Sequence, residues 1–197
     1  MNYKINEIFY SLQGEGFHAG TPAVFVRFSG CNLHCSFCDT DFTDYVRMDA
    51  DEIVQNAVAL VPKDSLRHQL NPMVVLTGGE PTLQVNAELI DKFHAAGFNF
   101  VTMESNGTAL PPNNLDWLTV SPKESVKVDC CQELKCIFDG KSDPERWKIN
   151  AEHYFLQPCD LEDDKLNSDI IQRCIDYIMN HPRWRLSLQI HKLVGIR

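Results

Sequence analysis

The chain has 197 residues, of which 44% are hydrophobic and 23% are charged, values that suit a globular protein with one sizeable core. The formal net charge of −9 argues against nucleic acid or an anionic membrane surface as the main partner, because both attract basic proteins. The sequence has no apolar run of about 20 residues and no basic N-terminal region followed by an apolar run, so we expect neither a membrane span nor a signal peptide.

Short β-rich apolar runs recur along the chain and predict the strands of a mostly parallel sheet. Several of these runs are nearly continuous rather than alternating, which indicates strands that are buried on both faces. In chain order, the expected strands span residues 23–28, 73–77, 99–104, 118–120, 134–138, 153–157 and 186–190.

Three stretches have the residue spacing of amphipathic helices. Asp49 opens the first, Asn86 can cap the second, and Ser168 can cap the third. Gly97 ends the second helix, and Pro182 follows the third. Strands that alternate with helices in this way predict βαβ units with right-handed crossovers.

The later crossovers are expected to be abbreviated, because residues 106–116 form a loop rich in Asn and Pro that has no room for a packed helix. We therefore predict an α/β fold, namely a partial (open) TIM-like barrel of mostly parallel strands with a reduced set of helices. Residues 1–197 are expected to form a single domain. In such folds ligands bind at the carboxyl ends of the strands, where the motifs described below fall.

The strongest signal is the sequence CNLHCSFC at residues 31–38, which follows the first expected strand. The thiolates of Cys31, Cys35 and Cys38 can converge on one soft metal centre. A zinc site usually needs a fourth nearby ligand, whereas three local thiolates suit an iron cluster that is open to a small molecule. The alternatives are three buried cysteines, or a zinc site completed by His34 or by a distant cysteine. Without an export signal, the eight cysteines indicate a reducing cytoplasm.

The spacing of the triplet resembles the signature of the radical S-adenosylmethionine (SAM) superfamily, and TGGEP at residues 77–81 resembles its GGE motif. This resemblance implies a [4Fe–4S] cluster whose open iron binds SAM, and SAM cleavage to a 5′-deoxyadenosyl radical. Two glycines would let the backbone approach the ligand closely. The residues predicted to contact SAM are Phe37, Cys38, Asp39, Gly78, Gly79, Glu80, Ser105, Ser121, Pro122, Lys123, Gln157, Pro158, Cys159 and Asp160.

Within the superfamily, the chain resembles the 7-carboxy-7-deazaguanine synthase family over essentially its whole length. The motifs are SLQGEG (11–16), FVRF (25–28), CDT (38–40), TGGEP (77–81), ESNGT (104–108), SPK (121–123) and QIHKL (189–193). The resemblance implies a carbon–nitrogen lyase of queuosine biosynthesis that converts 6-carboxy-5,6,7,8-tetrahydropterin to 7-carboxy-7-deazaguanine, releases ammonia and regenerates SAM. It also implies a homodimer, a flavodoxin or ferredoxin as electron donor, and Mg²⁺ bound by Thr40, whose alternative role is a turn hydroxyl.

Two charged residues are the main candidates for handling the pterin. Arg27 lies within an apolar strand and suits bidentate capture of the pterin carboxylate, although a buried pair with an acidic residue is the alternative. Glu104 ends a strand and could be the catalytic general acid or base, or simply a structural carboxylate. The other predicted substrate contacts, partly by family match, are Leu12, Gln13, Gly14, Glu15, Thr77, His191 and Arg197.

Two other functions have to be weighed against this reading. A glycyl-radical activating enzyme is also a short radical SAM protein, but it has no need of Arg27 or of a Mg²⁺ ligand. A zinc-stabilised binding module would be colourless and would lack iron–sulfur absorbance. The cysteines outside the triplet do not have a known cluster spacing, so we assign no second cluster to Cys130, Cys131, Cys136, Cys159 and Cys174.

Overall fold

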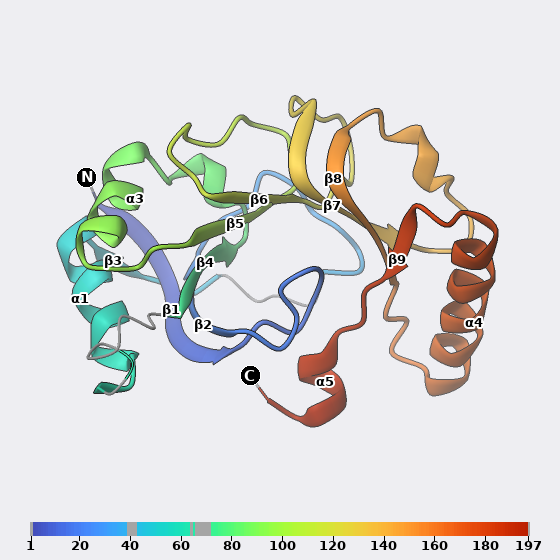
Figure 1. The fold of residues 1–197 in the computed structure, drawn as a ribbon, viewed down its shortest axis with the longest axis horizontal. Coiled ribbons are helices and arrows are strands. Elements are labelled where there is room, and N and C mark those ends of the chain that lie inside the picture. The colour runs from blue at the N-terminus through green and yellow to red at the C-terminus, as the bar shows by residue number, and fades with distance from the viewer. Residues whose placement is uncertain (1, 39–42, 64, 66–71, 197) are drawn as a thin grey trace.

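The computed structural model describes residues 2–38, 43–63, 65 and 72–196 (Figure 1). These residues form one curved sheet with the strand order β3-β1-β2-β4-β5-β6-β7-β8-β9. The strands are β1 (Tyr3–Leu12), β2 (Pro22–Phe28), β3 (Val46–Met48), β4 (Met73–Gly78), β5 (Val101–Ser105), β6 (Trp117–Val120), β7 (Cys130–Phe138), β8 (Asn150–Pro158) and β9 (Trp184–Leu186).

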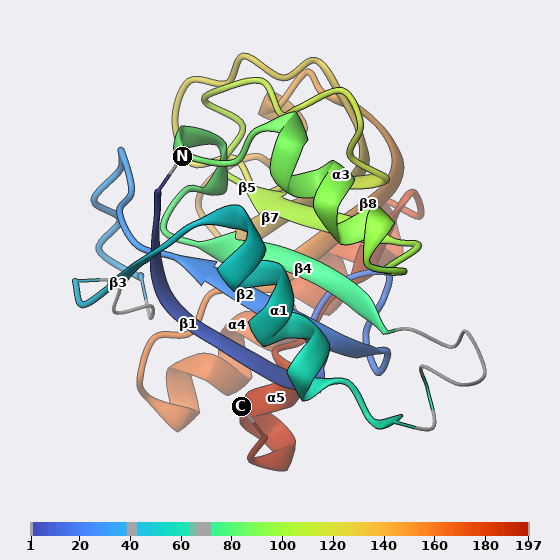
Figure 2. The same cartoon turned by 90° about the vertical axis from the view of Figure 1, so that its left-hand side faces the viewer.

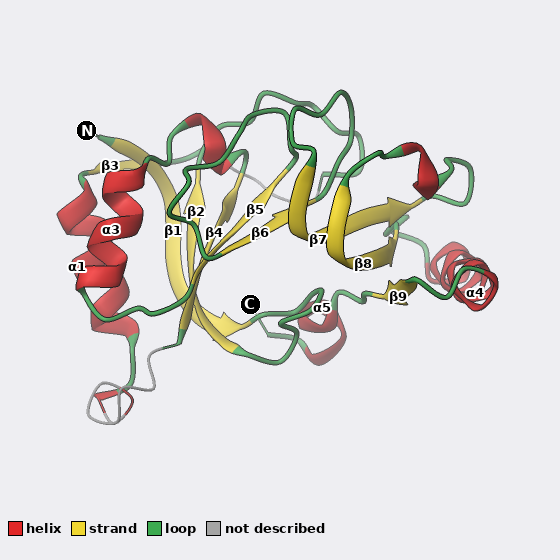
Figure 3. Cartoon of the chain, turned by 45° about the horizontal axis from the view of Figure 1, so that its top comes forward, coloured by secondary structure: helices red, strands yellow, loops and turns green. Residues whose placement is uncertain are grey.

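The sheet is mostly parallel and open. Every neighbouring pair from β2 to β9 is parallel, whereas β1 is antiparallel to β2 and β3 is antiparallel to β1. Figure 3 shows the strands curving into an arch whose two ends do not pair with each other. The predicted fold class, a partial barrel with few helices, is confirmed.

The helices described are α1 (Ala50–Leu60), α3 (Ala87–Ala95), α4 (Asp164–Asn180) and the short α5 (Ile190–Val194), with 3₁₀ turns η1 (Pro81–Leu83) and η2 (Pro144–Arg146). Two caps agree with the sequence analysis. Asp49 caps α1 in a reciprocal capping box with Glu52, and the Asn86 side chain accepts a hydrogen bond from the Leu89 N–H at the start of α3. Between β5 and β6 the chain is a loop, as expected.

Two predicted elements are wrong in position. Helix α4 begins at Asp164 and is capped by Asp163, so Ser168 lies inside the helix. The acidic run before it supplies the cap, because carboxylates favour the positive end of a helix. The strand expected at 186–190 ends at Leu186, and α5 then begins at Ile190. Strand β1, with its mixed polar and apolar residues, was not predicted at all.

The two faces of the sheet differ in chemistry. The outer face packs against helices in a hydrophobic core that includes Phe28, Phe93 and Trp184, and Figure 2 shows α1 and α3 lying across this face. The inner face is mixed: a small second hydrophobic cluster that includes Phe9, Phe25 and Val75 lies beside polar and charged side chains. On β7, for example, Leu134 and Cys136 belong to the core, whereas Lys135 lines the cavity inside the arch. None of the helices in the described residues is long and apolar enough to cross a bilayer.

Candidate active site

A cavity of about 780 Å³ lies inside the arch, at the carboxyl ends of the parallel strands. It brings together most of the residues predicted from the sequence. Glu80 and Pro122 are not among its lining residues, and Asp39, Thr40 and Arg197 lie outside the described part of the chain. The predicted residues that line it are Leu12, Gln13, Gly14, Glu15, Arg27, Cys31, Cys35, Phe37, Cys38, Thr77, Gly78, Gly79, Glu104, Ser105, Ser121, Lys123, Gln157, Pro158, Cys159, Asp160 and His191.

The three cysteines of the triplet share one wall of this cavity. The Cys38 N–H donates to the Cys35 carbonyl oxygen at 3.2 Å, and the Leu33 N–H lies 3.4 Å from the Cys31 sulfur. Burial raises the pKa of the Cys35 thiol, the ammonium of Lys123 opposes this shift, and the other two thiols reinforce it. The thiols are therefore close enough to interact, and three thiolates on one wall suit an iron–sulfur cluster.

No three His, Cys, Asp or Glu side chains of the described residues are arranged to hold a single metal ion. A [4Fe–4S] cluster does not need that arrangement, because each of its cysteine ligands binds a different iron.

Gly78, the last residue of β4, and Gly79 line the cavity, and both also pack closely against another part of the backbone. A Cβ on Gly79 would lie 2.0 Å from the Gly30 carbonyl oxygen, and one on Gly78 would lie 2.2 Å from the Phe28 carbonyl oxygen. The N–H groups of Gly79 and Glu80 donate to these same two carbonyls, each at 2.9 Å. The glycines therefore let this loop pack against the backbone that leads into the cysteine triplet, and so fix where the triplet begins.

Glu80 is fully buried beneath the cavity wall. One carboxylate oxygen accepts hydrogen bonds from the hydroxyls of Ser105, at 2.8 Å, and Thr82, at 2.6 Å. The other accepts from the Asn106 N–H at 2.7 Å. Glu80 thus ties the loop after β4 to the loop after β5, two of the loops that line the cavity.

Arg27 has a carboxylate partner and also lines the cavity. Its Nε lies 2.8 Å from Oε1 of Glu7 on the adjacent strand β1, and both side chains are partly exposed. The guanidinium carbon lies 5.9 Å from the centre of the Phe9 ring. From the sequence, Arg27 could either pair with a carboxylate or serve the site, and the structure shows the pair at the cavity wall.

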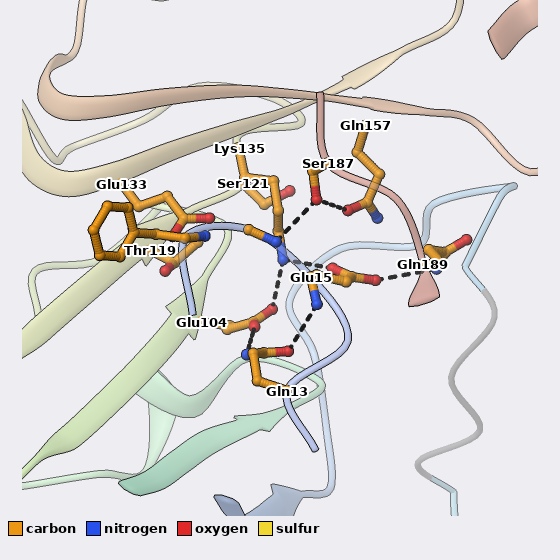
Figure 4. Close-up of polar contacts among 12 residues, drawn as sticks. Gln13, Glu15, Glu104, Thr119, Ser121, Glu133, Lys135, Gln157, Ser187 and Gln189 are labelled. Carbon is orange, nitrogen blue, oxygen red and sulfur yellow. Dashed lines mark hydrogen bonds and ion pairs between the residues drawn. The ribbon is translucent and has the colours of Figure 1, made fainter. Parts of the chain in front are cut away.

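A buried group of charges forms the floor of the cavity (Figure 4). Nζ of Lys135 lies 2.5 Å from Oε2 of Glu15 and 3.1 Å from Oε2 of Glu104. Burial alone would lower the pKa of Lys135, but the carboxylates of Glu104, Glu15 and Glu133 raise it above its ordinary value. Burial likewise opposes ionisation of Glu15, and the ammonium of Lys135 reverses this and lowers the Glu15 pKa. For Glu133, burial prevails and raises the pKa to about 7.

The C-terminal segment closes the open side of the arch. In Figure 1, α5 lies between the β1–β2 end of the sheet and β9. The Ile190 N–H donates to the Gly14 carbonyl at 3.0 Å, and the Ser187 hydroxyl accepts from the Gly16 N–H at 3.0 Å. A Cβ on Gly14 would meet Nδ1 of His191 at 2.3 Å, so alanine at this position would displace the His191 ring.

Comparisons with known proteins agree with this site. The model of the radical SAM superfamily matches residues 25–125. The chain is 48% identical to a 7-carboxy-7-deazaguanine synthase of Bacteroides thetaiotaomicron and 42% identical to one of Bradyrhizobium diazoefficiens, with all of both chains covered in each case. The chain belongs to the 7-carboxy-7-deazaguanine synthase family. This membership confirms the resemblance seen in the sequence and favours it over the activating-enzyme and zinc-module readings.

The crystal structure of QueE from Escherichia coli has the same fold. It superposes with a TM-score of 0.70, at 24% identity, over 97% of this chain and 95% of that chain. As a member of the 7-carboxy-7-deazaguanine synthase family within the radical SAM superfamily, the chain uses a [4Fe–4S] cluster and SAM. Cys31, Cys35 and Cys38 all line the cavity, and their thiolates could hold such a cluster.

Several cavity residues of this synthase-family chain were not predicted. Lys135 carries the same signal that identified Arg27, a charge within an apolar strand, and could have been found in that way. Gln189 lies inside a motif that was recognised, but its contact with Glu15 was not expected. Asn106 lies inside the recognised ESNGT motif but was given no contact, and Glu7 lies in a segment whose sequence gives no sign that it faces the cavity.

Proposed function

We propose that this cavity is where the chain converts 6-carboxy-5,6,7,8-tetrahydropterin to 7-carboxy-7-deazaguanine with loss of ammonia. The observation that carries the proposal is that one cavity unites three cluster cysteines with a cation, Arg27, and a buried group of carboxylates around Lys135. The first set suits radical generation, and the second suits an anionic substrate rich in hydrogen-bonding groups.

The two sets divide the work of the reaction. When bound, the cluster and SAM supply the 5′-deoxyadenosyl radical that takes hydrogen from C6 of the pterin. Arg27 binds the pterin carboxylate, while Thr77 and the segment Leu12–Glu15 recognise the pyrimidine edge. Glu104 moves a proton during loss of nitrogen, and both its oxygens are already fixed by N–H donors. His191 and the C-terminal segment complete the substrate side.

The SAM contacts follow from the same arrangement. Gly78 and Gly79 border the methionyl end next to the triplet, with Glu80 supporting them from beneath. Ser105, Ser121 and Lys123 reach the ribose or the carboxylate of SAM from the ends of β5 and β6. The remaining contacts, several of them from the end of β8 near the adenine, are Phe37, Cys38, Asp39, Pro122, Gln157, Pro158, Cys159 and Asp160.

Further features of the proposal come from the family resemblance. They are a Mg²⁺ ion held by Thr40, a homodimer, a flavodoxin or ferredoxin as electron donor, and the Arg197 carboxylate as a substrate contact. A cytoplasmic location suits thiols that must stay reduced to hold a cluster. One radical SAM domain over residues 1–197 is supported by the single sheet that runs from β1 to β9.

The test is anaerobic reconstitution with iron and sulfide, followed by reduction and addition of SAM, Mg²⁺ and the pterin. Product formation is followed by mass and ultraviolet absorbance, with Cys35→Ala as the control that cannot hold the cluster. We expect 7-carboxy-7-deazaguanine from the wild type and none from the variant. SAM cleavage without conversion of the pterin would overturn the substrate assignment, and zinc in place of a cluster would overturn the reaction class.

A further inference from the structure

Lys135 is a charged side chain in the middle of a buried strand. Its side chain is only 3% exposed, on the face of β7 that points into the arch, and its neighbours Leu134 and Cys136 face the hydrophobic core. Replacing a buried ion pair by apolar residues is often neutral or stabilising. Stability alone therefore gives no reason for a lysine at this position, and its partners point to another role.

The two partners of Lys135 come from distant parts of the chain and both line the cavity. Glu15 lies in the loop between β1 and β2, and Glu104 lies near the end of β5. The Lys135 ammonium contacts one oxygen of each, Oε2 in both cases. A single buried cation thus fixes the distance between two carboxylates that face the substrate space.

Each carboxylate is also held at its second oxygen by a glutamine amide. Nε2 of Gln13 donates to Oε1 of Glu104 at 2.9 Å, and Nε2 of Gln189 donates to Oε1 of Glu15 at 3.2 Å. Figure 4 shows the resulting chain of contacts from Gln13 to Gln189 through Lys135. Because all four oxygens accept from N–H donors, this geometry suits two ionised carboxylates in fixed orientations.

We propose that Lys135 is a positioning residue of the reaction, which holds Glu104 and Glu15 as oriented, ionised acceptors at the cavity floor. The inference rests on the proposed function, since it assumes that these two carboxylates face the pterin. Lys135 acts through them, on the substrate side of the cavity. It is therefore expected to affect conversion of the pterin and to leave cluster assembly and SAM cleavage unaffected.

The test compares Lys135→Met and Lys135→Arg with Cys136→Ala, a matched substitution on the opposite face of the same strand. Four quantities are measured: iron–sulfur absorbance, 5′-deoxyadenosine formed with dithionite in the absence of pterin, equilibrium affinity for the pterin without reductant, and kcat and KM for the pterin. Melting temperatures report the folded fraction of each variant.

We expect Lys135→Met to lower kcat by about 100-fold or more, as loss of an oriented acid–base group does, and to weaken pterin binding. Its cluster absorbance and 5′-deoxyadenosine yield should match the wild type. Lys135→Arg, which keeps the charge but changes the geometry, should have an intermediate kcat. Cys136→Ala should lower the melting temperature and leave kcat unchanged.

The proposal is overturned if Lys135→Met retains the wild-type kcat and pterin affinity. It is also overturned if cluster, SAM cleavage and product fall together, which indicates a structural role only. If Lys135→Met does not fold, the proposal is tested with Lys135→Arg instead. A wild-type kcat in Lys135→Arg then contradicts the proposal. A wild type that cleaves SAM but makes no product overturns the proposed function instead, so the two failures are distinguishable.

Discussion

The cavity is built by two regions that use different physical means. The loops after β2 and β4, within the segment that matches the radical SAM superfamily, are held against each other by backbone packing, and the buried Glu80 side chain adds hydrogen bonds to the end of β5. Their close contacts depend on glycines that no other residue could replace without a clash. On the opposite side, Glu15, Lys135 and Gln189 lie outside that segment and Glu104 lies within it, and the group is fixed by side-chain hydrogen bonds and buried charge.

This difference indicates how chemistry and specificity are divided in the fold. Backbone packing is insensitive to which polar side chains surround it, so it suits a cofactor site that a whole superfamily shares. A network of side-chain hydrogen bonds can be altered one residue at a time, so it suits the recognition of one substrate. The predictions below test whether the two regions separate in this way, and they run from the largest expected effect to the smallest.

The largest expected effect is a difference between Glu104→Gln and Cys35→Ala in which of the two reaction products each variant loses. Loss of an acid–base group typically costs about 10²–10⁴-fold in rate, so Glu104→Gln should lose product formation to that extent while still producing 5′-deoxyadenosine. Cys35→Ala should lose both. Anaerobic assays that quantify the two products side by side measure the difference. Equal loss of both products in Glu104→Gln would place Glu104 with the cofactor and not with the substrate.

Arg27→Ala tests recognition of the substrate carboxylate. A hydrogen-bonded charge is worth about 1.5–3 kcal/mol, which corresponds to roughly a 10- to 150-fold weaker affinity for the pterin. Isothermal titration of the variant measures this directly. Glu7→Gln removes the carboxylate that pairs with Arg27 and serves as the control for that ion pair. Unchanged affinity and turnover in Arg27→Ala would favour a reaction on a substrate without the carboxylate.

Gly79→Ala tests the backbone packing of the cofactor side. The added Cβ would lie 2.0 Å from the Gly30 carbonyl oxygen, which accepts a hydrogen bond from the Glu80 N–H, so we expect a loss of about 1–3 kcal/mol or more in the free energy of unfolding. Gly20→Ala is the control for loss of a glycine without a clash, since no atom lies within 4 Å of the new Cβ; alanine strains its φ of +86°, a strain that is absent at Gly79 and that works against the expected difference. Denaturant unfolding should show the larger loss for Gly79→Ala, together with poor cluster loading. Equal losses would refute the packing argument.

Glu133→Gln tests, through the pH dependence of stability, whether a buried carboxylate on the substrate side has a raised pKa. Burial raises the pKa of Glu133 from 4.5 to about 7, so the folded state binds this proton more tightly than the unfolded chain does. Glu133 therefore makes the protein less stable as the pH rises from about 4.5 to about 7, by on the order of 3 kcal/mol.

The variant lacks this titration, so its free energy of unfolding should increase relative to that of the wild type as the pH rises from 5 to 8. Urea unfolding of the cluster-free protein at several pH values measures the gain, and the exposed residue Glu152, changed to Gln, is the control. A constant difference between Glu133→Gln and the wild type at all pH values would show that Glu133 is ionised throughout.

The smallest effect is expected from Lys192→Ala. Lys192 pairs with Asp160 at 2.9 Å and joins α5 to the loop after β8, but both side chains are 37% exposed. Such pairs contribute about 0.2–1 kcal/mol, so thermal unfolding should shift only slightly. A large destabilisation would mean that closure of the arch by the C-terminal segment depends on this one ion pair.

The sequence was sufficient for the parallel strands, two helix caps and most of the cavity lining, because apolar runs and strand-end motifs are local signals. It was insufficient for β1, whose sequence mixes polar and apolar residues without a clear strand pattern, and for α5, whose position depends on contact with Gly14. The contact of Gly78 and Gly79 with SAM stays a prediction, whereas their packing against the backbone before the cysteine triplet was not foreseen, because that segment is distant in sequence. The Glu15–Lys135–Glu104 group was missed for the same reason, since its three members meet only in the folded chain.

One measurement tests the central claim most directly. Reconstituted, reduced protein is incubated with SAM and with the pterin deuterated at C6, and the products are analysed by mass spectrometry. The account predicts formation of 7-carboxy-7-deazaguanine together with deuterium in the 5′-deoxyadenosyl group. Unchanged pterin beside deuterium-free 5′-deoxyadenosine would contradict it, because the radical would then form without a substrate held in the same cavity.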